Sequence, residues 1–249
     1  MKRAILSLVA AALAGVATAC SPAPPEQDKT GPQAAGDWTR PPVIQRVDRT
    51  GSTLVVSGVA QADGRVVLRS DDGAAFAASA DSRGRFEIRL PAPAARLLLR
   101  PETQVGQDTA PSPDQLLILA GGQGPVVVLR PGGATRRLDA APALGAVDSD
   151  GRMRLASGRV AQGTDRVEVR SDGETVQVAP DAAGGWSVML APHGGPDQIQ
   201  VDGRDFVWPG EAPASAGLSV ERLESGWRVR WPGPAGASQS TWLPDPAGP

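Results

Sequence analysis

The chain has 249 residues and a formal net charge of −2 at pH 7, with 25 basic and 27 acidic residues, one histidine, one cysteine and no tyrosine. This balance excludes the usual kind of nucleic-acid-binding protein, which gains affinity by replacing phosphate counterions with lysine and arginine. A single cysteine also excludes an internal disulfide, so stability must come from burial of the core.

The first twenty residues have the pattern of a secretory signal. Lys2 and Arg3 precede an apolar run over residues 4–16, which is shorter than the roughly 20 residues that a transmembrane helix needs. The run ends in Ala17-Thr18-Ala19-Cys20, which resembles the lipobox of bacterial lipoproteins. The resemblance implies that residues 1–19 are a lipoprotein signal peptide and that Cys20 becomes the N-terminus, modified by acyl chains such as palmitate. The alternative is an ordinary cleaved signal with an incidental cysteine.

Lipidation at Cys20 would hold the protein on a membrane. Loss of Lys2 and Arg3 with the signal leaves a net charge of about −4, and no polybasic cluster follows the cysteine. Attachment is therefore expected to depend on the acyl chains, each buried CH₂ group contributing about 0.8 kcal/mol. In bacterial lipoproteins an aspartate after the lipidated cysteine favours the inner membrane, and here Ser21 occupies that position. We expect a cell-envelope protein at the outer membrane, facing the periplasm.

The segment after the signal is predicted to be a disordered tether over residues 20–42. It is rich in proline, alanine and polar residues and cannot bury enough apolar surface to order itself. As a flexible coil it would span roughly 25 Å, and roughly 70 Å if its prolines keep it extended. The folded part would therefore reach clear of the lipid headgroups.

After the tether the sequence repeats itself with an offset of about 100 residues. The matching segments are 47–58 with 147–158, 66–71 with 167–172, 86–90 with 186–190, and 130–132 with 231–233. This repeat predicts two modules, residues 43–142 and 143–249, each of ordinary domain size.

Within each copy the apolar residues alternate with a period of two. Residues 85–90, 166–170 and 227–231 follow this pattern, which is typical of strands with one buried face. Glycine is expected to supply the positive φ of the intervening turns at Asp63-Gly64, Asp72-Gly73, Asp150-Gly151 and Asp172-Gly173. Short strands separated by such turns predict an all-β fold of antiparallel sandwiches.

The second copy resembles the Ig-like modules that secreted bacterial proteins carry in series. The resemblance rests on Ser157-Gly158, residues 167–169, the turn over 181–185, and the strands at 186–190 and 198–201. Transthyretin-like and carboxypeptidase-regulatory-like modules have a similar pattern. The chain lacks the cysteine pair of Ig domains. The resemblance implies a spacer or a contact surface, and it carries no catalytic residues.

The sequence offers little for catalysis or cofactor binding. His193 is the only histidine and lies in a predicted loop, so neither a zinc site nor a Ser-His-Asp triad is expected. The segment 148–151 resembles a fragment of a calcium loop but lacks the later glutamate, and we interpret it as a turn. We therefore predict a non-enzymatic protein with no catalytic residue, metal or cofactor, although an enzyme of unrecognised type stays an open alternative.

Three tryptophans are the remaining candidates for a site. Trp227 and Trp231 should share one face of a strand, and Trp242 is expected to return opposite them on the next strand. Such a row either fills a sandwich core or, if exposed, stacks against sugar rings or contacts a partner.

These observations favour a non-enzymatic lipoprotein of the envelope. It would act as a spacer or as a contact module for an unidentified envelope protein, with no nucleic-acid partner. The alternative is a glycan-binding module, with peptidoglycan bound at Trp227, Trp231 and Trp242.

Overall fold

The computed structural model describes residues 38–233 and 236–245 and confirms an all-β fold. Apart from one short 3-10 helix, η1 (Ala120–Gly122), the regular structure in this part of the chain consists of strands. The strand pairs are antiparallel throughout. The predicted signal peptide, Cys20 and the tether as far as residue 37 lie outside the described residues.

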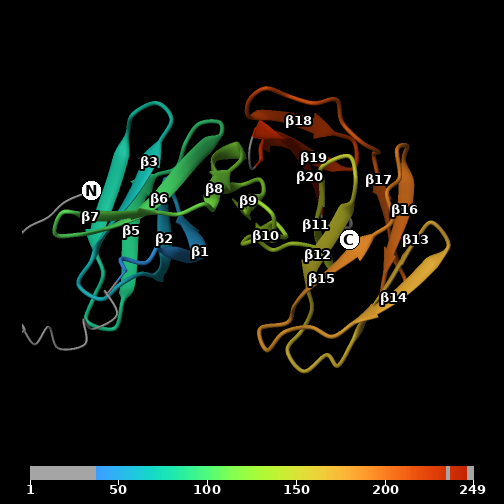
Figure 1. Cartoon of the computed structure of the whole chain (residues 1–249), viewed down its shortest axis with the longest axis horizontal. Helices are drawn as coiled ribbons and strands as arrows, with labels where there is room; N and C mark the ends of the chain where they lie inside the picture. The colour runs from blue at the N-terminus through green and yellow to red at the C-terminus, as the bar shows by residue number, and fades with distance from the viewer. Residues whose placement is uncertain (1–37, 234–235, 246–249) are drawn as a thin grey trace, which may run out of the picture. The chain divides into compact units, whose positions relative to one another are not determined.

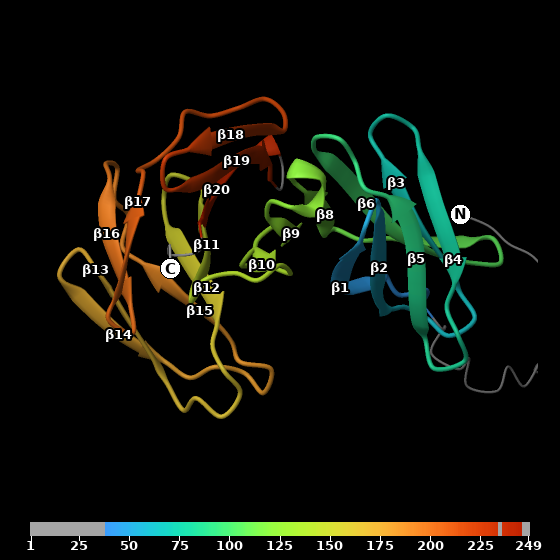
Figure 2. The same ribbon diagram turned by 180° about the vertical axis from the view of Figure 1, so that it is seen from behind.

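Two sheets form the N-terminal half (Figures 1 and 2). Sheet A has the order β1-β2-β5, and sheet B has the order β10-β9-β8-β6-β3-β4, with β7 paired to β6. The strands are β1 (Val43–Thr50), β2 (Thr53–Val59), β3 (Arg65–Ser70), β4 (Ala75–Ser79), β5 (Arg85–Pro91), β6 (Leu97–Val105), β7 (Asp108–Pro111), β8 (Gln115–Ile118), β9 (Val126–Leu129) and β10 (Arg136–Arg137).

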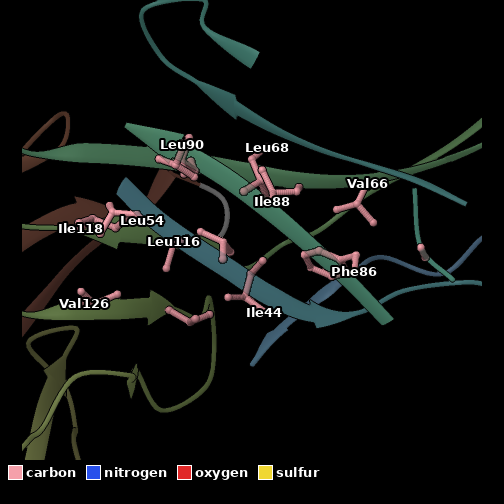
Figure 3. Packing of buried hydrophobic residues seen from close by; sticks show 14 residues of the cluster. Ile44, Leu54, Val66, Leu68, Phe86, Ile88, Leu90, Leu116, Ile118 and Val126 are labelled. Atoms are coloured by element: carbon pink, nitrogen blue, oxygen red, sulfur yellow. The ribbon is translucent and has the colours of Figure 1, made fainter. Parts of the chain in front are cut away.

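The facing surfaces of sheets A and B enclose the first core. In β5 every second residue is buried, with Phe86, Ile88 and Leu90 inside and the charged residues between them outside. Figure 3 shows these side chains gathered with Val66 and Leu68 of β3. The predicted alternation is confirmed, and the two sheets pack as a sandwich.

Two further sheets form the C-terminal half. Sheet C has the order β15-β12-β11-β20-β19-β18, and sheet D has the order β14-β13-β16-β17. The strands are β11 (Leu144–Ser149), β12 (Arg154–Arg159), β13 (Val167–Ser171), β14 (Glu174–Val178), β15 (Gly185–Leu190), β16 (Asp197–Val201), β17 (Arg204–Trp208), β18 (Ser219–Leu223), β19 (Gly226–Pro232) and β20 (Ser238–Pro244). A second core lies between these sheets and contains Trp186, Trp208 and Trp242.

The sequence repeat is reproduced in the strand register. Strands β1, β2 and β5 pair in the same order as β11, β12 and β15. The register of the first pair shifts between Ile44 and Arg46, and that of the second shifts between Leu144 and Ala146, at the same place in the repeat. A bulge bends its strand and sets which face its residues present, so the two copies share more than a hydrophobic pattern.

A glycine at the same place in each copy lets an aromatic ring lie on the backbone. Gly58 pairs with Phe86, and Gly158 pairs with Trp186. A Cβ atom at either glycine would collide with a carbonyl oxygen across the strand pair and come within 3 Å of the ring. The glycine of the repeated Ser-Gly pair is therefore required by close packing rather than by a turn.

The turn glycines follow the prediction at three of the four expected sites. Gly73, Gly151 and Gly173 have positive φ, whereas at the remaining turn Asp63 has a φ of 59° and Gly64 does not take that conformation. A Cβ at Gly64 would lie 3.0 Å from both a backbone oxygen and a side-chain carbon. The expectation for Gly64 was wrong because this glycine is needed for space, while aspartate tolerates the left-handed conformation.

The last strands of the two halves join different sheets. In the N-terminal half β8 and β9 extend sheet B beside β6, whereas β18, β19 and β20 extend sheet C beside β11. Both faces of β8 and β9 are buried. One face belongs to the first core, and the other contributes to a third apolar cluster, here called the shared core. The shared core consists of Leu98, Leu117, Leu119, Val127 and Leu129 from the N-terminal half and Ala146, Val229, Trp231 and Leu243 from the C-terminal half.

The shared core makes residues 38 onward one compact unit. The predicted boundary between residues 142 and 143 falls between β10 and β11, in a segment without strands. Whether residues 43–142 and 143–249 are separate domains, and whether they are Ig-like, stays a prediction.

A buried ion pair distinguishes the second copy from the first. Arg154 is fully buried where the first copy has Leu54. Its Nη1 donates to Asp197 Oδ2 at 2.7 Å, and its guanidinium lies 4.6 Å from the ring centre of Trp208. Ser171 Oγ also donates to Asp197 Oδ2, at 2.5 Å. Burial opposes ionisation of Asp197, but the bonds from Ser171 and Arg154 outweigh it and hold its pKa below the ordinary value.

We expect Asp197→Asn to destabilise the fold by about 3–5 kcal/mol at pH 7, because the variant leaves the Arg154 charge buried without its counter-charge. Since the pKa of Asp197 is lowered by folding, its carboxylate stabilises the native state above pH ~3.9 and loses this effect as the pH falls through the folded pKa. Urea unfolding of both proteins from pH 7 to pH 2 measures this difference in stability. A difference that does not shrink in acid would contradict a role for the charge.

Candidate functional site

The three predicted site tryptophans lie on two faces of sheet C. Trp231 is 2% exposed in the shared core beside Val229, and Trp227 is half-buried against the same cluster. Trp242, also 2% exposed, belongs to the core between sheets C and D. The expectation that Trp242 returns on the face of the other two was wrong. Trp242 pairs with Arg228, and paired residues share a face of the sheet. Because side chains alternate along β19, Arg228 and Trp242 lie on the face opposite to Trp227 and Trp231. The three indoles therefore form no exposed row.

A polar network lies beside the shared core and connects the two halves. The Asp148 carboxylate on β11 accepts three bonds of 2.6 Å, from the backbone N–H and hydroxyl of Thr135 and from the hydroxyl of Thr241. Trp231 Nε1 donates to the same Thr241 oxygen at 3.1 Å. Ser157 Oγ donates to the Thr135 carbonyl at 3.0 Å. The segment that leads into β10 is thus fastened to strands β11, β12 and β20.

The surroundings of Asp148 in this network shift its pKa. Burial raises the pKa of Asp148 above its ordinary value, although the hydrogen bonds from Thr135 and Thr241 favour the charged form. Asp150, two residues later, instead accepts backbone bonds from Arg152 and Met153. Asp148 and Ser149 belong to β11, so the turn is confined to the residues that follow, where Asp150 accepts the local backbone bonds, and the interpretation of the whole segment 148–151 as a turn was too broad.

A cavity of about 690 Å³ opens where the segment around β10 meets β12 and β15. Four arginines, Arg130, Arg136, Arg137 and Arg159, line it together with two aspartates, Asp139 and Asp181. The remaining wall is mostly small and apolar and includes one aromatic ring, that of Trp186.

The arginines around the cavity have different partners. Arg137 is buried and forms an ion pair with Asp139 at 2.9 Å, and it also donates to the carbonyl of Pro244 at 2.5 Å. Arg136 donates through Nη2 to the carbonyl oxygen of Ile44. Arg159 is exposed and makes no ion pair with any described residue. Arg137 therefore has a structural role, while Arg136 and Arg159 retain unused donors.

Sequence reasoning missed this cavity. Of its four arginines, one follows β9, two form β10 and one ends β12, and no regular spacing in the sequence relates them. His193, in contrast, lies in the predicted loop between β15 and β16, with its Nδ1 3.7 Å from Asp172.

The described residues were compared with the expectations for a metal site and for a membrane-spanning helix. Over residues 38–233 and 236–245, no three His, Cys, Asp or Glu side chains gather in a way that would hold a metal ion. Within the same residues, no helix has the length and apolar character needed to cross a bilayer. The predicted lipid attachment at Cys20 lies outside these residues and stays a prediction.

Comparison with known proteins adds no family assignment. No protein-family model matches the chain, and no curated protein is significantly similar to it.

The placement of the tryptophans has a spectroscopic consequence. Trp38 is 87% exposed, whereas Trp186, Trp208, Trp231 and Trp242 are all at most 5% exposed. We therefore expect Trp38→Phe to reduce quenching of tryptophan emission by acrylamide several-fold and to shift the emission to the blue. Trp231→Phe is the matched variant and should leave most of the quenching in place. Quenching in Trp38→Phe that exceeds what the half-buried Trp227 alone can supply would contradict burial of the other four indoles.

Proposed function

We propose that this protein is a membrane-anchored lipoprotein of the bacterial envelope whose folded part acts as a stiff spacer and protein-contact module. The observation that carries the proposal is the shared core, in which side chains from both halves are buried against one another. A chain that is fixed at one end by lipid and stiff beyond its tether holds its far surface at a defined distance from the end of the tether, while the tether sets how far the folded part can move from the membrane.

A hinge between the two halves would expose side chains of the shared core. Leu117, Leu129 and Leu243 are completely or almost completely buried in the shared core, and each buried leucine contributes about 1.5–3 kcal/mol. Separation of the halves would expose these side chains and break the bonds from Thr135 to Asp148. Interfaces between mobile domains are more polar than this.

A glycan-binding role has less support. Sugar rings stack on exposed aromatic faces, and of the three candidate residues only Trp227 is partly exposed. The face of Trp227 is also shared with Arg222, whose guanidinium lies 5.3 Å from the ring centre. The spacer and protein-contact role is therefore the function that we propose.

The anchor is tested by replacing Cys20. We expect the wild-type chain, produced in a Gram-negative host, to incorporate labelled palmitate and to sediment with the membranes. Cys20→Ala should lose both properties, because a chain without acyl groups has no polybasic segment to hold it on lipid.

Ser21→Ala is the matched control, since it changes the neighbouring residue and leaves the cysteine in place. It should keep both the label and the membrane association. Membrane association of Cys20→Ala equal to that of the wild type would overturn the proposed anchor.

A further inference from the structure

We infer that the arginine-lined cavity beside β10 is a binding site for the oxyanion group of a small ligand. The inference goes beyond the spacer role and does not rest on lipid attachment. It is carried by the charges around the cavity and by its size.

The cavity concentrates positive charge in an acidic protein. Four of its lining residues are arginines and two are aspartates, whereas the whole chain has a net charge of −2. Burial lowers the pKa of Arg136, and the positive charges of Arg130 and Arg159 lower it further. Arg130 and Arg159 thus both lie close enough to Arg136 to disfavour its charge, and an anion placed beside Arg136 would offset that repulsion.

The carboxylates of the wall are already engaged. Asp139 accepts bonds from Arg137 and from the backbone N–H of Val126. Asp181 accepts the backbone N–H groups of Ala183 and Gly185, which stabilises the turn before β15. Neither carboxylate forms an ion pair with Arg136 or Arg159 in the described structure.

One carboxylate outside the wall offsets part of the charge. Asp114 Oδ2 lies 3.5 Å from Arg130 Nε, and burial raises the pKa of Asp114. Because Asp114 offsets the charge of Arg130, Arg136 and Arg159 are the arginines that remain to bind an anion.

The size of the cavity fits a small organic anion. A volume of about 690 Å³ lies within the range of small-molecule sites. Alanine side chains at Ala134, Ala140 and Ala179 leave room and offer an apolar surface to the body of the ligand. Guanidinium groups bind both carboxylate and phosphate through paired N–H donors. The shared chemistry of the ligand is therefore an oxyanion.

The test is a titration of the purified full-length chain, in non-ionic detergent, with inorganic phosphate and separately with succinate. Chloride replaces each anion so that the ionic strength stays constant, because screening alone changes charge interactions. We expect saturable binding of at least one anion by isothermal calorimetry. We also expect it to raise the thermal unfolding midpoint. Binding of phosphate alone identifies a phosphate-like ligand, and binding of succinate alone identifies a carboxylate.

Arg159→Gln is the decisive variant because Arg159 is exposed and can be replaced without loss of an ion pair seen in the structure. We expect it to weaken anion binding at least about tenfold, as loss of a charge-assisted bond should. Arg83→Gln removes an equal charge from an exposed turn away from the cavity and should bind like the wild type. The inference is overturned if neither anion binds saturably, or if both variants bind like the wild type or weaken equally.

Discussion

The burial of β8 and β9 on both faces is the constraint on which the rest of this structure depends. Along each strand, successive side chains enter different cores, so that Leu116 and Ile118 pack against sheet A while Leu117 packs against the C-terminal half. A strand with two apolar faces cannot lie at a solvated surface without exposing one of them. Sheet B therefore needs a covering layer on each side, and sheet C supplies the outer one.

Sheet C likewise contributes side chains to two cores, one on each of its faces. Val229 and Trp231 of β19 enter the shared core, while Trp242 of the adjacent β20 enters the core with sheet D. Thr241, the residue before Trp242, then lies on the shared-core side and binds both Asp148 and Trp231. The position of this tryptophan-rich hairpin is thus explained by packing between sheets. The arginine-lined cavity follows from the same arrangement, because the strand-poor segment around β10 bridges the two halves beside it.

Much of the fold could be predicted from local patterns. Alternation in β5 and the repeat through Gly58 and Gly158 reflect short-range sterics and side-chain periodicity, and the structure confirms both. The face of Trp242 was not predictable in this way, because a shift of one residue in the pairing after the Pro232 turn moves every side chain to the other face. The shared core had a signal in the unbroken apolar runs at 116–119 and 126–129, which is typical of strands buried on both sides. The cavity had none, since its arginines are brought together only by tertiary packing.

Calorimetric unfolding of the purified chain tests the central claim, that the two halves unfold as one body through the shared core. We expect a single transition in which the van't Hoff and calorimetric enthalpies agree, with a ratio of about one. Leu117→Asp, which places a charge in the shared core, should lower the unfolding temperature or split the transition. Two independent transitions in the wild type, with neither moved by Leu117→Asp, would show that the halves are separate domains and that the shared core does not couple them.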